Sequence, residues 1–135
     1  DAQQAEVLKR MVKDLFFNVK LRIMPIVREA DGLAKSSRNT YLSKSERAAA
    51  VILNSSLETA SMLFKAGERS SQKLVEGVKK LIGDEPMAQI DYVEIYALPG
   101  LTPAPEVLTK GQYLLALAVK FGTTRLIDNV ILEVE

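Results

Sequence analysis

The 135-residue sequence contains no cysteine and no histidine. No disulfide can therefore form, which is consistent with a reducing compartment, and we expect a cytoplasmic location. Zinc sites built from Cys and His are excluded, as are Ser-His-Asp and Cys-His catalytic arrangements within this chain alone. No apolar run approaches the roughly 20 residues that span a bilayer, and no secretory signal opens the chain, so no membrane partner is expected.

Charge is nearly balanced over the whole chain but not along it. The formal net charge is +1, which neither favours nor excludes nucleic acid, and we expect no nucleic-acid partner. Residues 9–47, however, hold ten Lys or Arg against four Asp or Glu. A local basic excess favours an anionic ligand, although a solvated basic surface explains it equally well. Because 47% of the residues are hydrophobic, the chain can form a core.

The first 26 residues predict a helix followed by a strand. Within Gln3–Phe16 the apolar residues fall on one helical stripe, and Val19–Ile26 alternates between apolar and polar residues as a strand does. A helix and a strand with nothing before them are typical of the end of an α/β unit. Since the chain begins with Asp1 and not Met, we expect that it has lost its natural beginning.

The remainder, residues 40–135, predicts a compact α+β domain with two main helices on a three-stranded antiparallel sheet. A capping box at Ser43–Glu46 opens a long helix that ends at Gly67, and a second helix spans Ser71–Gly83. Strands are predicted over residues 90–98, 113–119 and 125–134. The tight turn at residues 122–123 makes the last two antiparallel neighbours.

The longest polar loop, Val27–Tyr41, carries the residues with the clearest chemistry. Four consecutive side chains in it can contact phosphate: Lys35, Ser36, Ser37 and Arg38. Lysine supplies a point charge, arginine a planar fork of donors, and each serine a hydroxyl. Composition alone leaves a second explanation open, in which the serines and Asn39 only form turns and Arg38 is a surface charge.

The loop sequence VREADGLAKSSRN, residues 27–39, resembles the second signature of the pantothenate synthetase family, V-R-E-x-D-G-L-A-x-S-S-R-N. DAQQ at the start resembles the end of that family's Gly-Glu-Lys-Asp-x-Gln-Gln motif, and TRLIDNVIL resembles its closing strand. The resemblance implies a nucleotidyltransferase-superfamily ligase that joins pantoate to β-alanine with ATP. The resemblance implies a reaction that runs through a pantoyl adenylate and yields pantothenate, AMP and pyrophosphate.

The resemblance also implies a division of the chain. Residues 1–39 would end a truncated Rossmann-like nucleotide-binding domain and include its ATP loop, and residues 40–135 would form a C-terminal lid domain. The family's His-x-Gly-His motif cannot lie here, because the chain has no histidine. We therefore expect no catalytic residue within this chain beyond a charge-stabilising Arg38, and no activity from the chain alone.

Residue roles follow from the same resemblance. ATP contacts are implied for six residues: Asp1, Val27, Lys35, Ser36, Ser37 and Arg38. A pantoate contact is implied for Gln4, and Arg38 would stabilise the charge that develops on pyrophosphate. Mg2+ would accompany ATP with its ligands outside this chain, so no metal ligand is expected here, and the full-length enzyme would be a homodimer. Two positions depart from the family: Lys35 replaces the usual Met or Leu, and Ala2 replaces a frequent aromatic residue.

Two other functions remain open from the sequence. One is a different adenylate-forming nucleotidyltransferase, which would activate another acid for another amine. The other is a stand-alone α+β interaction module whose serine–arginine loop binds a phosphorylated partner.

Overall fold

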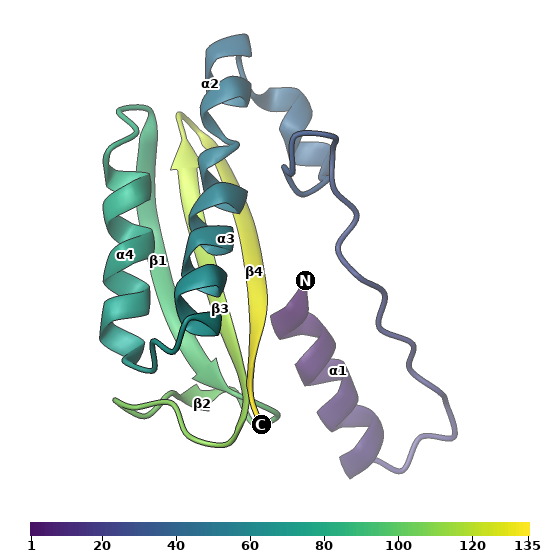
Figure 1. The fold of residues 1–135 in the computed structure, drawn as a ribbon. Helices are drawn as coiled ribbons and strands as arrows, with labels where there is room; N and C mark the ends of the chain where they lie inside the picture. Colours follow the sequence, from purple (N-terminus) through teal and green to yellow (C-terminus); the bar gives the residue numbers. More distant parts are fainter.

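Antiparallel strands and two long helices form the larger part of the computed structural model, which describes residues 1–135 (Figure 1). The helices are α1 (Ala2–Asp14), α2 (Lys44–Ala49), α3 (Ile52–Lys65) and α4 (Ser71–Gly83), with a 3-10 helix, η1, at Ser37–Tyr41. The strands are β1 (Ala88–Ala97), β2 (Thr102–Pro103), β3 (Gly111–Phe121) and β4 (Thr124–Val134). The predicted α+β domain is confirmed.

The sheet has the strand order β2-β1-β3-β4, and every neighbouring pair is antiparallel. β3 and β4 form the predicted hairpin, in which Phe121 pairs with Thr124 across a turn where Gly122 has φ +62°. β2 is a two-residue edge strand that the sequence did not predict, because its Pro103 favours a loop and only an edge strand tolerates proline.

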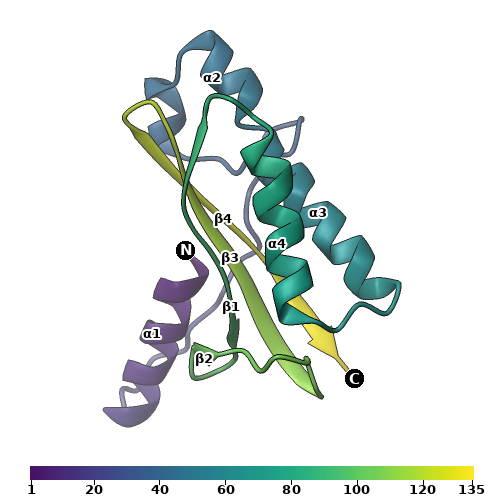
Figure 2. The same ribbon diagram turned by 90° about the vertical axis from the view of Figure 1, so that its left-hand side faces the viewer.

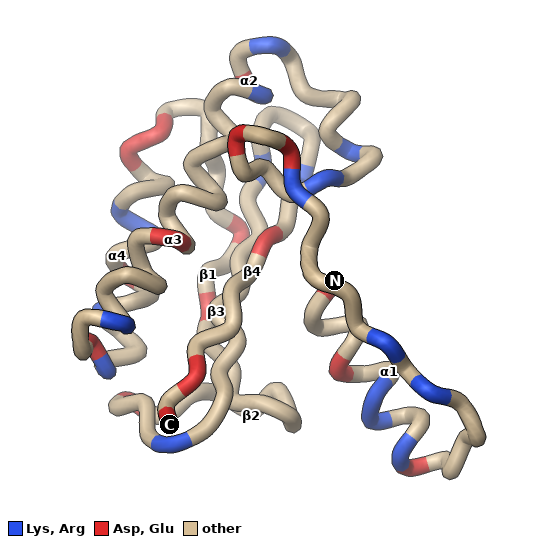
Figure 3. The backbone as a smooth tube through the Cα atoms, turned by 45° about the vertical axis from the view of Figure 1, so that its right-hand side comes forward, with Lys and Arg blue, Asp and Glu red and all other residues tan.

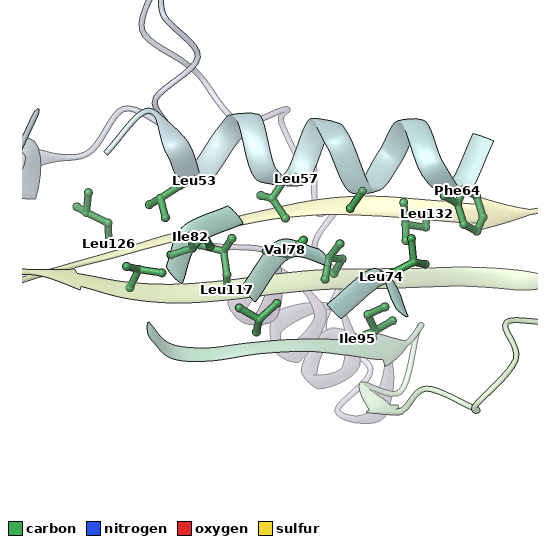
Figure 4. Packing of buried hydrophobic residues seen from close by; sticks show 14 of the residues in the cluster. Leu53, Leu57, Phe64, Leu74, Val78, Ile82, Ile95, Leu117, Leu126 and Leu132 are labelled. Carbon is green, nitrogen blue, oxygen red and sulfur yellow. The ribbon is translucent and has the colours of Figure 1, made fainter. Parts of the chain in front are cut away.

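The core lies between α3, α4 and one face of the sheet (Figure 4). Leucines 53 and 57 reach it from α3, Leu74 and Ile82 from α4, and Leu117 from β3. Each of these side chains is at most 2% exposed, and full burial of such a side chain contributes about 1.5–3 kcal/mol. β3 is apolar on both faces because it is central: Leu114 and Ala118, on the face opposite Leu117, are also at most 1% exposed.

The single long helix predicted after Ser43 is in fact two helices, α2 and α3. The capping box is confirmed, since Ser43 Oγ accepts from Glu46 N at 3.1 Å and Glu46 Oε1 accepts from Ser43 N at 2.8 Å. The chain then tightens at residues 50–51, where Leu53 N donates to Ala50 O three residues back. The β-branched pair Val51 and Ile52 lies at this break, and such residues favour a helix less than straight-chain ones.

Helix α1 lies on the side of the sheet opposite α3 and α4 (Figure 2). The predicted helix is confirmed, but the strand predicted for Val19–Ile26 is wrong. None of the backbone hydrogen bonds involves residues 18–26, and a strand exists only where a neighbour pairs with it. No residue before Leu33 is buried, so the apolar stripe of α1 is at least partly exposed and the alternating side chains after it are exposed.

The unpaired segment makes a prediction about proteolysis of this chain. Limited trypsin digestion should cut after Lys20 or Arg22 before it cuts after Lys65 in α3, because residues 18–26 need no unfolding to enter a protease. Mass spectrometry of the first fragments is the measurement. First cuts within α3 or α4 would contradict the assignment of residues 18–26 as the least structured part of the chain.

Candidate active site

The signature sequence folds into a short turn at the end of β4 nearest α2. Arg28 and Ala34 form an isolated antiparallel bridge, and Glu29 N donates to Leu33 O at 2.8 Å. Lys35 N donates to Val27 O, also at 2.8 Å. Gly32 closes the turn at φ +95°, a conformation that glycine adopts at no steric cost. We call residues 27–35 the signature turn.

The four phosphate-compatible residues begin where the signature turn ends. Ser36 caps η1 by accepting from Arg38 N at 3.2 Å, and Thr40 Oγ1 donates to Ser37 O at 2.8 Å. Asn39 Nδ2 donates back to Ala34 O at 3.1 Å, which ties η1 to the turn. Lys35, Ser36, Ser37 and Arg38 are all exposed. The local backbone is therefore ordered while these four side chains remain accessible to a ligand.

A cleft of about 490 Å³ opens beside this loop, a volume within the range of small-molecule sites. It is bounded by the start of α1, the loop and residues of β1 and β4. Four of the residues predicted to contact ATP line it: Asp1, Lys35, Ser36 and Arg38. Ser37 and Val27 do not line it, although Ile26 beside Val27 does.

Asp1 and Gln4, the residues predicted to contact ATP and pantoate, both lie at the start of α1. Asp1 Oδ1 caps α1 by accepting from Gln3 N at 2.8 Å and Gln4 N at 3.2 Å, so the first residue is held in place. Gln3 lines the cleft, whereas Gln4 faces a second, open space of about 920 Å³ between α1, residues 21–28 and β4. The predicted pantoate residue and the predicted phosphate residues therefore lie in adjacent spaces, and Asp1 borders both.

Three cationic side chains line the cleft: Lys35, Arg38 and Arg125. Arg38 Nη1 donates to the backbone oxygen of Arg125 at 3.4 Å, which brings the loop against β4. The Arg125 guanidinium pairs with Asp91 at 2.9 Å and lies 5.8 Å from the centre of the Tyr92 ring. Basic residues also lie along α1, along the segment after it and on α2 (Figure 3). The cleft can thus attract an anion.

Sequence reasoning missed the cleft residues that come from the sheet. They are Tyr92 and Tyr96 of β1 and residues 125–129 of β4. The period-2 alternation of β4 places residues 125, 127 and 129 on one face, and that face is opposite to the one carrying Leu126 and Leu132. This alternation was the available signal, but it does not reveal which segment lies against the face.

Two Arg–Asp pairs surround the signature turn. Arg28 binds Asp128 of β4 through two hydrogen bonds of 2.7 and 2.8 Å, and Asp128 is only 3% exposed. These hydrogen bonds raise the pKa of the Arg28 guanidinium above its usual value. Arg47 of α2 binds Asp31 at 2.9 Å and holds the pKa of that carboxyl below its usual range. The same hydrogen bond raises the pKa of the Arg47 guanidinium, so Arg28, Arg47 and Asp31 all keep their charges at neutral pH.

One buried side-chain atom at the cleft has no hydrogen-bond partner, the Oδ1 oxygen of Asn39. A buried acceptor left unpaired costs about 1–3 kcal/mol, so this amide oxygen is a point at which a donor would gain a contact. No group of three or more Asp, Glu, His or Cys is arranged to hold a metal ion. No helix is both long enough and apolar enough to cross a membrane.

Known proteins that resemble this chain match it over nearly its whole length. A model of the pantoate-beta-alanine ligase family matches residues 1–131. The pantothenate synthetase of Pelotomaculum thermopropionicum is 55% identical over 132 residues, which are 98% of this chain and 46% of that protein. That of Acetivibrio thermocellus is 54% identical over 134 residues, 99% of this chain and 47% of its own length. The chain thus spans about half the length of the curated relatives it matches.

Solved structures agree with the sequence matches. The crystal structure of the Thermus thermophilus pantothenate synthetase superposes with a TM-score of 0.84 at 34% identity, covering 95% of this chain and 45% of that one. The Francisella tularensis pantoate-beta-alanine ligase, complexed with beta-gamma ATP and beta-alanine, gives a TM-score of 0.59 at 25% identity, covering 96% of this chain and 40% of that one. By sequence and by fold, the chain belongs to the pantoate-beta-alanine ligase family.

Proposed function

We propose that this chain is the C-terminal part of a pantothenate synthetase and provides the phosphate contacts of its ATP site and part of its pantoate site. The observation that carries the proposal is the convergence of Lys35, Ser36 and Arg38 on one cleft in a chain that matches the ligase family over residues 1–131. The Francisella tularensis relative, complexed with beta-gamma ATP and beta-alanine, supports ATP and β-alanine as substrates.

The proposed chemistry has two steps. A carboxylate oxygen of pantoate attacks the α-phosphorus of ATP, the bond from that phosphorus to the bridging oxygen breaks, and pyrophosphate leaves with its electrons. The amine of β-alanine then attacks the acyl carbon of pantoyl adenylate, loses a proton, and expels AMP. Adenylation is needed because a free carboxylate is a poor acyl donor, whereas AMP is a good leaving group.

The residues of the cleft suit the first step. Negative charge grows on pyrophosphate as the bond to the α-phosphorus breaks, and preorganised cationic donors stabilise such charge in the transition state. Arg38 can donate to two phosphate oxygens at once, Lys35 adds a point charge, and the Ser36 hydroxyl adds a neutral donor. Mg2+ belongs to the proposal as the ion that accompanies ATP, with its ligands in the other half of the enzyme.

The exposed apolar surface of α1 and residues 15–27 indicates that another part of the enzyme packs against it. Twelve large hydrophobic residues lie exposed in this region: Val7, Leu8, Met11, Leu15, Phe16, Phe17, Val19, Leu21, Ile23, Met24, Ile26 and Val27. An exposed apolar surface of this kind marks an interface. We propose that the N-terminal half of the enzyme covers it and that Gln4 then reaches pantoate. A homodimer and a cytoplasmic location remain predictions of this proposal.

Substitution of Arg38 tests the proposed phosphate site. In the full-length enzyme, Arg38→Ala should slow pantoyl adenylate formation by about 2–4 kcal/mol, the usual cost of losing one preorganised charge-stabilising donor. Amide formation from supplied pantoyl adenylate should remain nearly unchanged, because pyrophosphate has already left. Single-turnover kinetics of the two half-reactions measure both effects.

Arg10→Ala is the matched control, since Arg10 is an exposed arginine of α1 that pairs only with Asp14. It should leave both half-reactions unchanged. If Arg38→Ala slowed amide formation as much as adenylation, Arg38 would act on the protein as a whole and not on departing pyrophosphate.

Substitution of Gln4 tests the proposed pantoate site. Gln4→Ala should weaken pantoate binding by about 1–3 kcal/mol, because a hydrogen-bonding amide is lost and its partner is left unpaired. The KM for pantoate should therefore rise, while the KM for ATP should change much less. Gln72→Ala on the exposed face of α4 is the control and should change neither value. Equal effects of Gln4→Ala on both substrates would place Gln4 outside the pantoate site.

A further inference from the structure

The ion pair between Arg28 and Asp128 joins two segments that lie 100 residues apart in the sequence. The pair is bidentate: Arg28 Nη1 contacts Asp128 Oδ2 at 2.7 Å, and Arg28 Nη2 contacts Asp128 Oδ1 at 2.8 Å. Arg28 Nη1 also donates to Gly32 O at 3.0 Å, inside the signature turn. One guanidinium thus binds β4 and braces the turn at the same time.

The acidic partner is fixed as firmly as the arginine. Asp128 Oδ1 accepts from Asn129 N at 2.7 Å, so both carboxylate oxygens are used. Its side chain is 1% exposed and that of Arg28 is 27% exposed. A planar guanidinium facing a buried carboxylate permits one relative orientation, which lysine or a single hydrogen bond would not impose. The pair therefore sets the geometry of the turn against β4.

Three further contacts hold the signature turn on the C-terminal domain. Leu33 is 2% exposed and belongs to the same core cluster as Leu53 and Leu126. Gly32 lies so close to the side chain of Asn54 of α3 that a Cβ at position 32 would clash with it. Arg47 of α2 binds Asp31 at 2.9 Å.

The chain before the signature turn is held quite differently. Residues 18–26 make no backbone hydrogen bond. After the turn, Asn39 Nδ2 donates a hydrogen bond to Ala34 O, and Arg38 Nη1 donates one to the backbone oxygen of Arg125 on β4. Residues 34–38 are therefore anchored to β4 from both ends and only loosely connected to α1.

We propose that Arg28 and Asp128 form a positioning pair that holds residues 34–38 against the cleft, so that the loop moves with the C-terminal domain and not with α1. The pair does not contact the reacting atoms in this account; it acts through Lys35, Ser36 and Arg38. The identity of the ligand as the phosphates of ATP rests on the proposed function, whereas the positioning itself does not.

Amide hydrogen exchange of this 135-residue chain without ligand tests the positioning directly. Asp128→Asn keeps the size of the side chain and removes its charge. Exchange at residues 34–39 should accelerate at least about tenfold, equivalent to about 1.4 kcal/mol, while exchange in α4 and the centre of β3 stays unchanged. Asp14→Asn is the matched control, because it breaks an exposed Arg–Asp pair on α1 and should leave residues 34–39 unaffected.

A second variant keeps the test decisive if Asp128→Asn fails to fold. Arg28→Lys retains the charge but loses the bidentate fork, and it should accelerate exchange at residues 34–39 by a smaller factor. The proposal is overturned if exchange there is unchanged in a folded variant, or if it rises equally throughout α4 and β3, since the pair would then contribute only to general stability.

Kinetics of the full-length enzyme separate this proposal from the proposed function. Faster loop exchange with slower adenylation and an unchanged amide-forming step is the result expected. Faster loop exchange with unchanged adenylation would support the positioning of the loop but contradict its role at the phosphates of ATP. Unchanged loop exchange overturns the positioning whatever the adenylation rate does.

Discussion

The burial of one sheet face by α3 and α4 is the constraint on which the rest of the structure depends. It fixes β3 at the centre, places β4 beside it, and leaves the opposite face of β4 available for Arg125 and Asn129. The same core includes Leu33, so one buried leucine helps to attach the signature turn to the domain. Core packing therefore also sets the geometry of the site, because a residue of the core positions the segment that carries Lys35 and Arg38.

The sequence predicted the elements of the C-terminal domain because their signals are local. The capping box at Ser43 and Glu46, the glycine after α3 and the apolar run of β3 each depend on nearby residues. The strand over Val19–Ile26 failed for the opposite reason. Alternation describes a face of a strand, but pairing requires a neighbour, and no other segment of this chain provides one. The break at residues 50–51 was missed because the apolar stripe continues through it.

The site was predictable only in part. The sequence placed phosphate chemistry at residues 35–38, and the cleft contains three of those four side chains. It did not reveal that Arg125 and Tyr92 complete the cleft, since these contacts join residues that are distant in the chain. It also did not reveal the partner of Arg28, because nothing in the order of residues relates position 28 to position 128. The predicted domain division after residue 39 remains a prediction, although Leu33 and Arg28 attach the signature turn to the domain that follows it.

The products formed by the full-length enzyme show how the acid is activated. With ATP, pantoate and β-alanine, we expect pantothenate, AMP and pyrophosphate in equal amounts, and no product from this chain alone. Formation of ADP and inorganic phosphate would contradict the account, because it would mean that the acid is activated as an acyl phosphate and that pyrophosphate never leaves the cleft beside Arg38.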